Sequence, residues 1–162
     1  SQDIAKMNPA EYEQAMEIRK KSKKVRDAAL KNYINGRLGL LIDGTGKDYA
    51  KIATQKKRLE SVGYDCYMVF VNTDLEVALK RNQRRERKVP TDVVKKGWSD
   101  VQNNLGKFQS LFGASNMLIV DNSEYKEFGT AVKRGANSFT NRPIQNPIAK
   151  AWVKKELELR KS

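Results

Sequence analysis

The chain has 162 residues, of which 32 are Lys or Arg and 19 are Asp or Glu, so its formal net charge is +13. It contains no histidine, which excludes a Ser-His-Asp or Cys-His nucleophile and a His-ligated zinc within this chain. The length fits one domain with its own core. The excess of cations suits a protein that handles phosphates, and the alternative is a generally basic, solvated surface.

The single cysteine, Cys66, cannot form a disulfide within the chain. Its apolar neighbours predict a buried thiol. No segment approaches the ~20 apolar residues of a membrane span, and the N-terminus lacks the apolar region of a signal peptide. We therefore expect a cytoplasmic protein with no membrane partner.

Hydrophobic spacing predicts a first helix over residues 9–34. Asn8 and Glu11 are the capping residues expected at its start, and Gly36 is the residue expected to end it. Ser22 is a candidate position for a break in this helix. Short apolar runs predict three strands, at residues 38–42, 66–71 and 117–120. Further helices are predicted between and after these strands, over residues 48–62, from residue 75, over residues 91–112, from residue 124 and in the C-terminal segment.

Strands that alternate with helices predict an α/β fold, with a mainly parallel sheet flanked by helices. We expect one α/β domain over residues 1–140, followed by a linker and a C-terminal helix over residues 141–162. The residues expected to be buried lie on the three strands: Leu40, Ile42, Val69, Val71, Leu118 and Val120.

Ligands of parallel sheets bind beyond the carboxyl ends of the strands, which here are residues 43–47, 72–73 and 121–123. The segment 44–48 contains a Gly-Lys pair, as a Walker A loop does, but it departs from the pattern G-x-x-x-x-G-K-S/T at two positions. When the pattern is aligned on Gly46 and Lys47, Leu41 occupies the first glycine position, and Asp48 replaces the hydroxyl residue that binds Mg²⁺. Asp43, at a strand end, could hold Mg²⁺ directly or through water while the glycines let the backbone approach phosphates. The alternative is a turn that Asp43 caps.

The most unusual local feature is the basic run Lys80–Lys88. In a helix, its spacing places Arg81, Arg84 or Arg85, and Lys88 along one face, where they could clamp a polyphosphate and neutralise charge that develops during its transfer. The alternatives are a solvated helix face and a surface that binds nucleic-acid phosphates. The run contains no aromatic residue, which disfavours a stacking platform for single strands.

Four segments together resemble a known family: Leu-Ile-Asp-Gly-Thr-Gly (41–46), Val-Phe-Val-Asn-Thr (69–73), Arg-Asn-Gln-Arg-Arg-Glu-Arg (81–87) and Ile-Val-Asp-Asn (119–122). They are similar to the zeta-toxin and polynucleotide-kinase-like group of P-loop kinases, particularly the predicted kinases of tailed phages. The resemblance implies an incomplete P-loop kinase-like fold whose complete parent uses ATP and Mg²⁺. It implies catalytic roles for Asp43, which would hold Mg²⁺ indirectly, and for Arg81, Arg84 and Arg85, with phosphate or nucleotide binding by Gly44, Thr45, Gly46, Lys47, Arg87 and Asn122.

The departure from this family lies in residues 1–37, which supply no phosphate loop ending in Gly-Lys-Ser/Thr. We therefore expect the lid-bearing C-terminal part of an ATP-dependent kinase, inactive alone, in the cytoplasm or, for a phage protein, in the host cytoplasm. Its expected partner is a nucleotide or phosphorylated small molecule, with nucleic acid as a second class. The alternatives are a basic nucleic-acid-binding module and a catalytically silent kinase-like scaffold.

The resemblance also implies a gap in the sheet, because the absent phosphate-loop strand would lie between strands 38–42 and 66–71. Neighbouring strands are about 4.8 Å apart, so the gap would be about twice that distance. Unpaired apolar edges recruit other strands. We therefore expect that these two strands close up against each other, or that two chains form a homodimer through the exposed edges.

Overall fold

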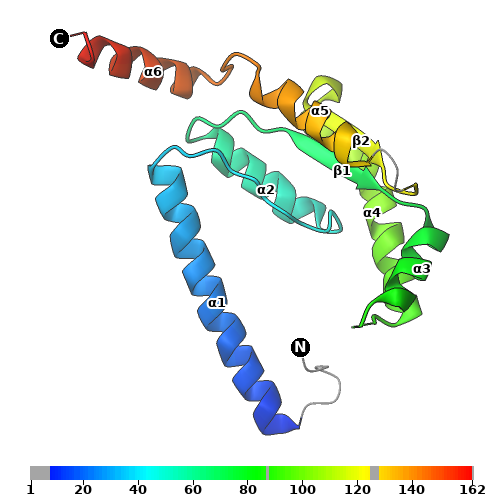
Figure 1. The fold of residues 1–162 in the computed structure, drawn as a ribbon. Coiled ribbons are helices and arrows are strands. Elements are labelled where there is room, and N and C mark those ends of the chain that lie inside the picture. Colours follow the sequence, from blue (N-terminus) through cyan, green and yellow to red (C-terminus); the bar gives the residue numbers. More distant parts are fainter. Residues whose placement is uncertain (1–7, 87, 125–127, 162) are drawn as a thin grey trace. The chain divides into compact units, whose positions relative to one another are not determined.

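A computed structural model of the chain describes residues 8–86, 88–124 and 128–161 (Figure 1). The chain divides into two compact units, Ser1–Gly44 and Thr45–Ser162. The first contains one helix, and the second contains a sheet with helices against it. Each unit is described below by itself.

The first unit is built on α1 (Pro9–Asn35), which is continuous through Ser22. Its start is fixed by a capping box, in which the Asn8 side chain accepts from the Glu11 N–H and the Glu11 carboxylate accepts from the Asn8 N–H. The helix ends at Gly36, whose N–H donates to the Asn32 carbonyl. The helix predicted over residues 9–34 is therefore confirmed, without the break at Ser22.

The strand predicted at residues 38–42 is wrong. This segment has no strand assignment, and its apolar side chains lie largely in solvent, with Leu41 101% and Ile42 46% exposed. An extended segment forms a strand only when a neighbour completes its backbone hydrogen bonds. Among the described residues the sheet has two strands, both in the second unit, and neither includes residues 38–42.

The second unit alternates helices with two strands and ends in two helices. Its elements are α2 (Tyr49–Glu60), β1 (Met68–Asn72), α3 (Leu75–Arg84), α4 (Thr91–Phe112), the 3₁₀ turn η2 (Ala114–Asn116), β2 (Met117–Asp121), α5 (Phe128–Thr140) and α6 (Pro147–Leu159). The predicted strands 66–71 and 117–120 and the predicted helices after residue 48 are confirmed to within a few residues. The chain thus has the expected α/β fold with a parallel strand pair.

The sheet consists of β1 and β2 in parallel, with Phe70 opposite Ile119 and Val71 opposite Val120. Side chains alternate between the two faces of a strand, so Phe70 faces one side of the sheet and Leu118 faces the other. Phe70 packs near the Phe108 ring of α4, with a 6.4 Å centroid distance, whereas Leu118 lies against Gly135 of α5. The strand pair is therefore covered by a helix on each face (Figure 1).

The core of this unit is the cluster of Phe70, Phe108 and Phe112, with Tyr49 and Ile52 of α2 packed against it. Phe108 is fully buried, and its ring lies 5.6 Å from that of Tyr49. On the opposite face Tyr67 stacks on Phe139 at 4.7 Å. Aromatic packing from both faces thus fixes the position of the short sheet.

Of the six residues expected to be buried, Val120 is buried and Val69, Val71 and Ile42 are exposed. Leu40 and Leu118 are half-buried. The expectation assumed strands with neighbours on both sides, as in a wide parallel sheet. In a two-stranded sheet each strand has an outer edge, and that edge leaves Val69 at 37% and Val71 at 43% exposure.

The closure of residues 38–42 against residues 66–71 would join the two units; it stays a prediction, as does the homodimer. The exposed apolar side chains of β1 favour it. We expect size-exclusion chromatography with light scattering to give twice the mass of one chain. Val69→Lys, which places a charge beside this edge, should shift the protein toward monomer, and a monomer at all concentrations would contradict the prediction.

The Cys66 thiol is half-buried, and its pKa is raised from 9.0 to about 11 by desolvation and then by the nearby Glu60 carboxylate. Because the raised pKa belongs to the folded state, this thiol contributes stability below pH 9.0 that is lost as the pH rises toward about 11. Reaction with iodoacetamide requires the thiolate. We expect slow reaction of the folded chain at pH 9, and a rate equal to that in urea would contradict this expectation.

Candidate functional site

The loops after β1 and β2 are joined to each other at the carboxyl edge of the sheet. The Asn122 N–H donates to the Asn72 carbonyl at 2.7 Å, and the Asp74 N–H donates to Ser123 Oγ at 3.0 Å. Ser123 also donates its backbone N–H to the Asp121 carboxylate at 2.8 Å. The edge predicted from the sequence therefore forms, with residues 72–74 and 121–123 side by side.

Hydrogen bonds from Ser123 lower the pKa of Asp121, the side-chain bond more than the backbone bond. The carboxylate is fully exposed. It therefore adds a negative charge to this edge at neutral pH, beside the uncharged Asn122.

Helix α4 forms side-chain hydrogen bonds with two of the loops predicted to form the site, the loop after β1 and the loop before α2. Trp98 Nε1 donates to the Thr73 carbonyl at 2.8 Å, and Gln102 Nε2 donates to Asn72 Oδ1 at 2.8 Å. Two residues further along, Asn104 Nδ2 donates to the carbonyls of Gly46 and Lys47, at 3.2 and 3.0 Å. The loop before α2 and the loop after β1 are thus bound to the same stretch of one helix.

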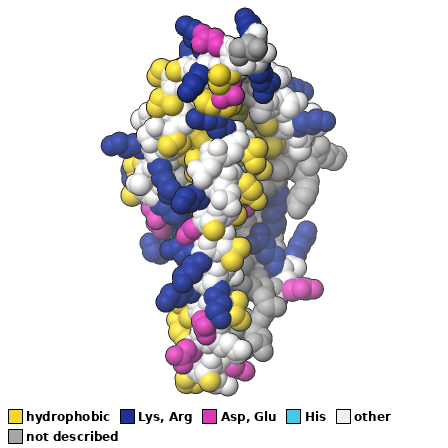
Figure 2. Space-filling view, turned by 90° about the vertical axis from the view of Figure 1, so that its left-hand side faces the viewer, with side chains coloured by type: hydrophobic (Ala, Val, Ile, Leu, Met, Phe, Trp, Pro, Cys, Tyr) yellow, Lys and Arg dark blue, Asp and Glu magenta, His cyan; other side chains and the backbone are white. Residues whose placement is uncertain are grey.

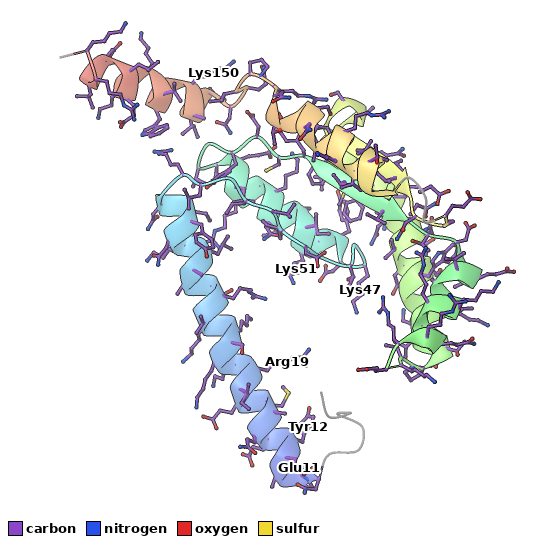
Figure 3. The ribbon with its side chains drawn as sticks, viewed as in Figure 1. Glu11, Tyr12, Arg19, Lys47, Lys51 and Lys150 are labelled. Carbon is purple, nitrogen blue, oxygen red and sulfur yellow. The ribbon has the colours of Figure 1, made fainter. Side chains whose placement is uncertain are left out.

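Gly46 turns the loop before α2 against α4. Its φ of 72° lies in the left-handed region, which favours glycine, and a Cβ at this position would lie 3.8 Å from Val101 and 3.9 Å from Phe108. The next residue, Lys47, is exposed. Figure 3 shows Lys47 at the N-terminal end of α2.

The N-terminus of α2 differs from the phosphate-binding helix end of a Walker A loop. Asp48 caps this helix, and its carboxylate accepts from the Lys51 N–H at 3.0 Å. In a Walker A loop a hydroxyl residue occupies this position, and free backbone N–H groups face the phosphate. The Asp48 carboxylate repels an anion from this helix end, so an anion near Lys47 would depend on lysine and arginine side chains.

The basic run begins on α3 and continues into the connection to α4. Arg81 is half-buried, whereas Arg84, Arg85 and Lys88 are exposed; the predicted site residue Arg87 lies outside the described residues. Figure 1 shows α3 and the start of α4 beyond the carboxyl end of β1. The elements that carry the described part of the basic run therefore follow the carboxyl edge formed by residues 72–74, and the roles predicted for its arginines stay predictions.

Asp43 and Gly44 belong to the first unit, whereas Thr45, Gly46 and Lys47 belong to the second. Asp43 was expected at the end of a buried strand, and that strand is absent. The site in the second unit therefore consists of residues 45–47, 72–74, 121–123 and the described part of the basic run. The roles predicted for Asp43 and Gly44 stay predictions.

Four site residues were missed by sequence reasoning: Asn82, Trp98, Gln102 and Asn104. Asn82 and Asn104 are buried polar side chains, 9% and 6% exposed. The available signal was two neighbouring amides, Asn82 and Gln83, inside an otherwise charged run, and three consecutive amides at residues 102–104 of a long helix. Buried amides require hydrogen-bond partners, so these positions pointed to contacts with loops.

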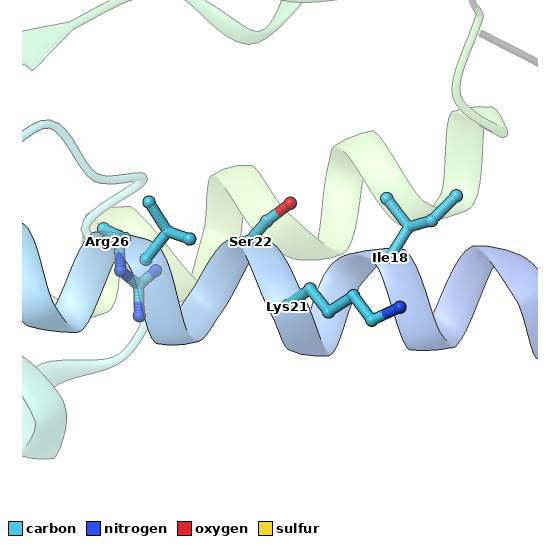
Figure 4. A pocket seen from close by; sticks show the side chains of 5 residues that line it. Ile18, Lys21, Ser22 and Arg26 are labelled. Carbon is cyan, nitrogen blue, oxygen red and sulfur yellow. The ribbon is translucent and has the colours of Figure 1, made fainter.

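A hollow of about 450 Å³ runs along α1 (Figure 4). Its lining consists of Ile18, Lys21, Ser22, Val25 and Arg26, all from this one helix. An open surface with no second wall does not enclose a ligand. The hollow therefore contributes nothing to the candidate site.

Within the described ranges, no three Cys, Asp or Glu side chains come close enough together to hold a metal ion. A Mg²⁺ ion with most of its ligands from water and substrate phosphate would not require such a group. No helix described by the structure is long and apolar enough to cross a membrane.

Comparisons with known proteins identify one family. No curated protein and no solved structure matches the chain. Residues 3–133 match the zeta toxin family, which is a P-loop, kinase-like family. This match covers far more than half of the 162 residues and includes β1, β2 and the basic run. The chain therefore belongs to the zeta toxin family of kinase-like, nucleotide-binding domains.

Proposed function

We propose that this chain is the arginine-bearing part of an ATP-dependent kinase that transfers the γ-phosphoryl group of ATP to a small molecule or a polynucleotide. The observation that carries the proposal is the common attachment of two loops to α4, at the edge beyond which the basic run lies. Trp98 and Gln102 bind residues 72–73, and Asn104 binds residues 46–47. This arrangement places a lysine, the strand ends and the arginines on one side of the sheet.

The arginines would supply the charge that phosphoryl transfer requires. Catalysis of this reaction depends mainly on positioning and on neutralising the charge of the transferred group. Arg84 and Arg85 are exposed, and neither forms a salt bridge with an acidic side chain of the described residues, so both can reach a polyphosphate. By the family resemblance Arg81 and Arg87 assist them, Asn122 contacts the nucleotide, and Asp43 holds Mg²⁺ through water.

The described residues of the candidate site suit binding of the phosphates of ATP, but they do not form a complete nucleotide-binding site. The sequence contains no G-x-x-x-x-G-K-S/T segment, and Asp48 caps α2, the helix that follows the Gly46-Lys47 pair. Magnesium bound to ATP would neutralise part of the phosphate charge. We therefore expect the chain alone to bind ATP weakly and to show no measurable ATP turnover.

The proposal is tested by neutralising Arg84 and Arg85 together. Each charge-assisted hydrogen bond contributes about 1.5–3 kcal/mol, so Arg84→Gln/Arg85→Gln should lower the affinity for Mg²⁺–ATP by about tenfold or more. The measurement is a nuclear magnetic resonance titration of the whole chain. Lys154→Gln/Lys155→Gln is the matched control, because it removes the same charge from exposed positions on α6.

Equal affinities of the two double variants would show that net charge alone attracts the nucleotide, and would contradict the proposal. Robust Mg²⁺-dependent hydrolysis of ATP by the wild-type chain would contradict the expectation that it is inactive alone. Both results are obtained from the same protein preparations.

A second candidate function, binding of nucleic acid, is favoured by the charge of +13 and by its wide distribution. Figure 2 shows Lys and Arg side chains spread over one face, with fewer acidic side chains between them. This candidate predicts tight binding to DNA or RNA that weakens steeply with salt and is lost in Arg84→Gln/Arg85→Gln. Binding unchanged in this variant would exclude the basic run as the contact surface.

A further inference from the structure

Asn82 forms an unusual pair of hydrogen bonds across the basic run. Its Nδ2 donates to the Val89 carbonyl at 2.7 Å, and its Oδ1 accepts from the Val89 N–H at 3.0 Å. The side-chain amide thus pairs with both backbone polar groups of one residue. Asn82 lies on α3 and is 9% exposed.

This pair closes the connection between α3 and α4 into a loop. Helix α3 ends at Arg84, and α4 begins at Thr91 after Pro90. Without the pair, the polar groups of Val89 would lack this partner, and the buried amide of Asn82 would be left without its own. If both hydrogen bonds are lost, the segment between α3 and α4 is expected to open, because an open segment has the higher conformational entropy and these bonds no longer compensate for it.

The residues inside the loop are the exposed cations of the candidate site. Arg84, Arg85 and Lys88 all lie between Asn82 and Val89 in the sequence. The far end of the loop is fixed as well, because α4 is bound to Thr73 through Trp98. A closed loop with both ends fixed holds its side chains at a defined position relative to the carboxyl edge of the sheet.

We infer that Asn82 is a positioning residue, which holds this loop closed so that Arg84 and Arg85 bind a polyphosphate together. The inference rests on the proposed function, because it assigns to Asn82 the geometry of that same site. Asn82 itself touches no phosphate in this account. Its contribution is to reduce the loss of side-chain and loop entropy when a ligand binds.

The closed loop is tested first without any ligand, by limited proteolysis with trypsin. Asn82→Ala should raise the rate of cleavage after Arg84, Arg85 and Lys88 by about fivefold or more, since open loops are the preferred sites of cleavage. Cleavage within α2, after Lys51 or Arg58, reports unfolding of the whole unit. Asn116→Ala is the matched control, because Asn116 also forms two side-chain hydrogen bonds, to Phe112 and Arg142.

An unchanged rate of loop cleavage in Asn82→Ala would overturn the inference. So would an equal increase in the loop and in α2, because that result reports lost stability alone. Loop cleavage that rises in Asn116→Ala by the same factor would lead to the same conclusion.

The effect on the arginines is tested with sodium triphosphate as the probe, by isothermal titration calorimetry. We expect Asn82→Ala to weaken binding about fivefold in the wild-type chain, and to cause no further loss in the Arg84→Gln/Arg85→Gln background, because Asn82 acts only through these arginines. Fully additive losses would overturn the positioning role. Wild-type binding that does not depend on Arg84 and Arg85 would contradict the proposed function, and the trypsin rates would still decide whether Asn82 closes the loop.

Discussion

Phe108→Ala is expected to lower the free energy of unfolding of the second unit by about 3–5 kcal/mol, the usual cost of truncating a buried aromatic side chain. Phe108 is fully buried between α2, α4 and the sheet, with the rings of Tyr49 at 5.6 Å and Phe70 at 6.4 Å. A Cβ built on Gly46 would lie 3.9 Å from the Phe108 ring, so loop 45–47 borders the cavity and should become less ordered. Urea denaturation followed by circular dichroism measures the loss.

Val93→Ala is the control for this substitution, because Val93 lies on the same helix and is 51% exposed. Its expected effect is within about 0.5 kcal/mol, as for other surface positions. A loss below about 1 kcal/mol for Phe108→Ala would contradict the packing of α2, α4 and the sheet around one cluster.

Gly135→Ala is expected to lower the free energy of unfolding by about 1–3 kcal/mol, although alanine is the better helix former. A Cβ at position 135 would overlap with Cδ2 of Leu118 on β2 and would lie 3.2 Å from its Cγ. Either Leu118 must leave its position or α5 must move away from the sheet. Urea denaturation measures this loss as well.

Two further variants separate the overlap from other causes. Gly106→Ala, on α4, meets no atom within 4 Å and should stabilise the unit by about 0.5–1 kcal/mol. Leu118→Ala removes the overlapping atoms, so adding Gly135→Ala to it should cause no further loss. A further loss equal to that in wild type would contradict the close packing of α5 on β2.

The helices were predictable from the sequence because their signals are local. Asn8 and Glu11 form a capping box within one turn, and Gly36 ends α1 through a bond to a residue four positions earlier. Such contacts depend on neighbours in the sequence, which periodicity and capping rules describe. The bounds of α1, α2 and α4 accordingly agree with the prediction to within two residues.

The strands were predictable only in part, because a strand depends on a partner. Residues 38–42 are as apolar as β1 and β2, yet in the part of the chain that the structure describes only β1 and β2 pair. The burial of Val69 and Val71 was overestimated for the same reason, since burial depends on how many strands and helices surround a position. Composition does not contain that information.

The site was predictable where it depends on topology. Parallel strands end at one edge, so residues 72–73 and 121–123 were expected together, and they are joined by backbone hydrogen bonds. The attachment of Asn104 to Gly46 spans 58 residues, and that of Gln102 to Asn72 spans 30. Pairs so far apart in the sequence arise from tertiary packing, which one sequence does not reveal.

The central claim is that loop 45–47, the strand ends and the basic run bind one polyphosphate together. The most direct measurement is a map of backbone amide shifts in the whole chain as sodium triphosphate is added. The account predicts shifts at Lys47, Thr73, Arg84, Arg85 and Asn122 that saturate with one common affinity. Shifts confined to α1 and α6, or separate affinities for Lys47 and the two arginines, would contradict it.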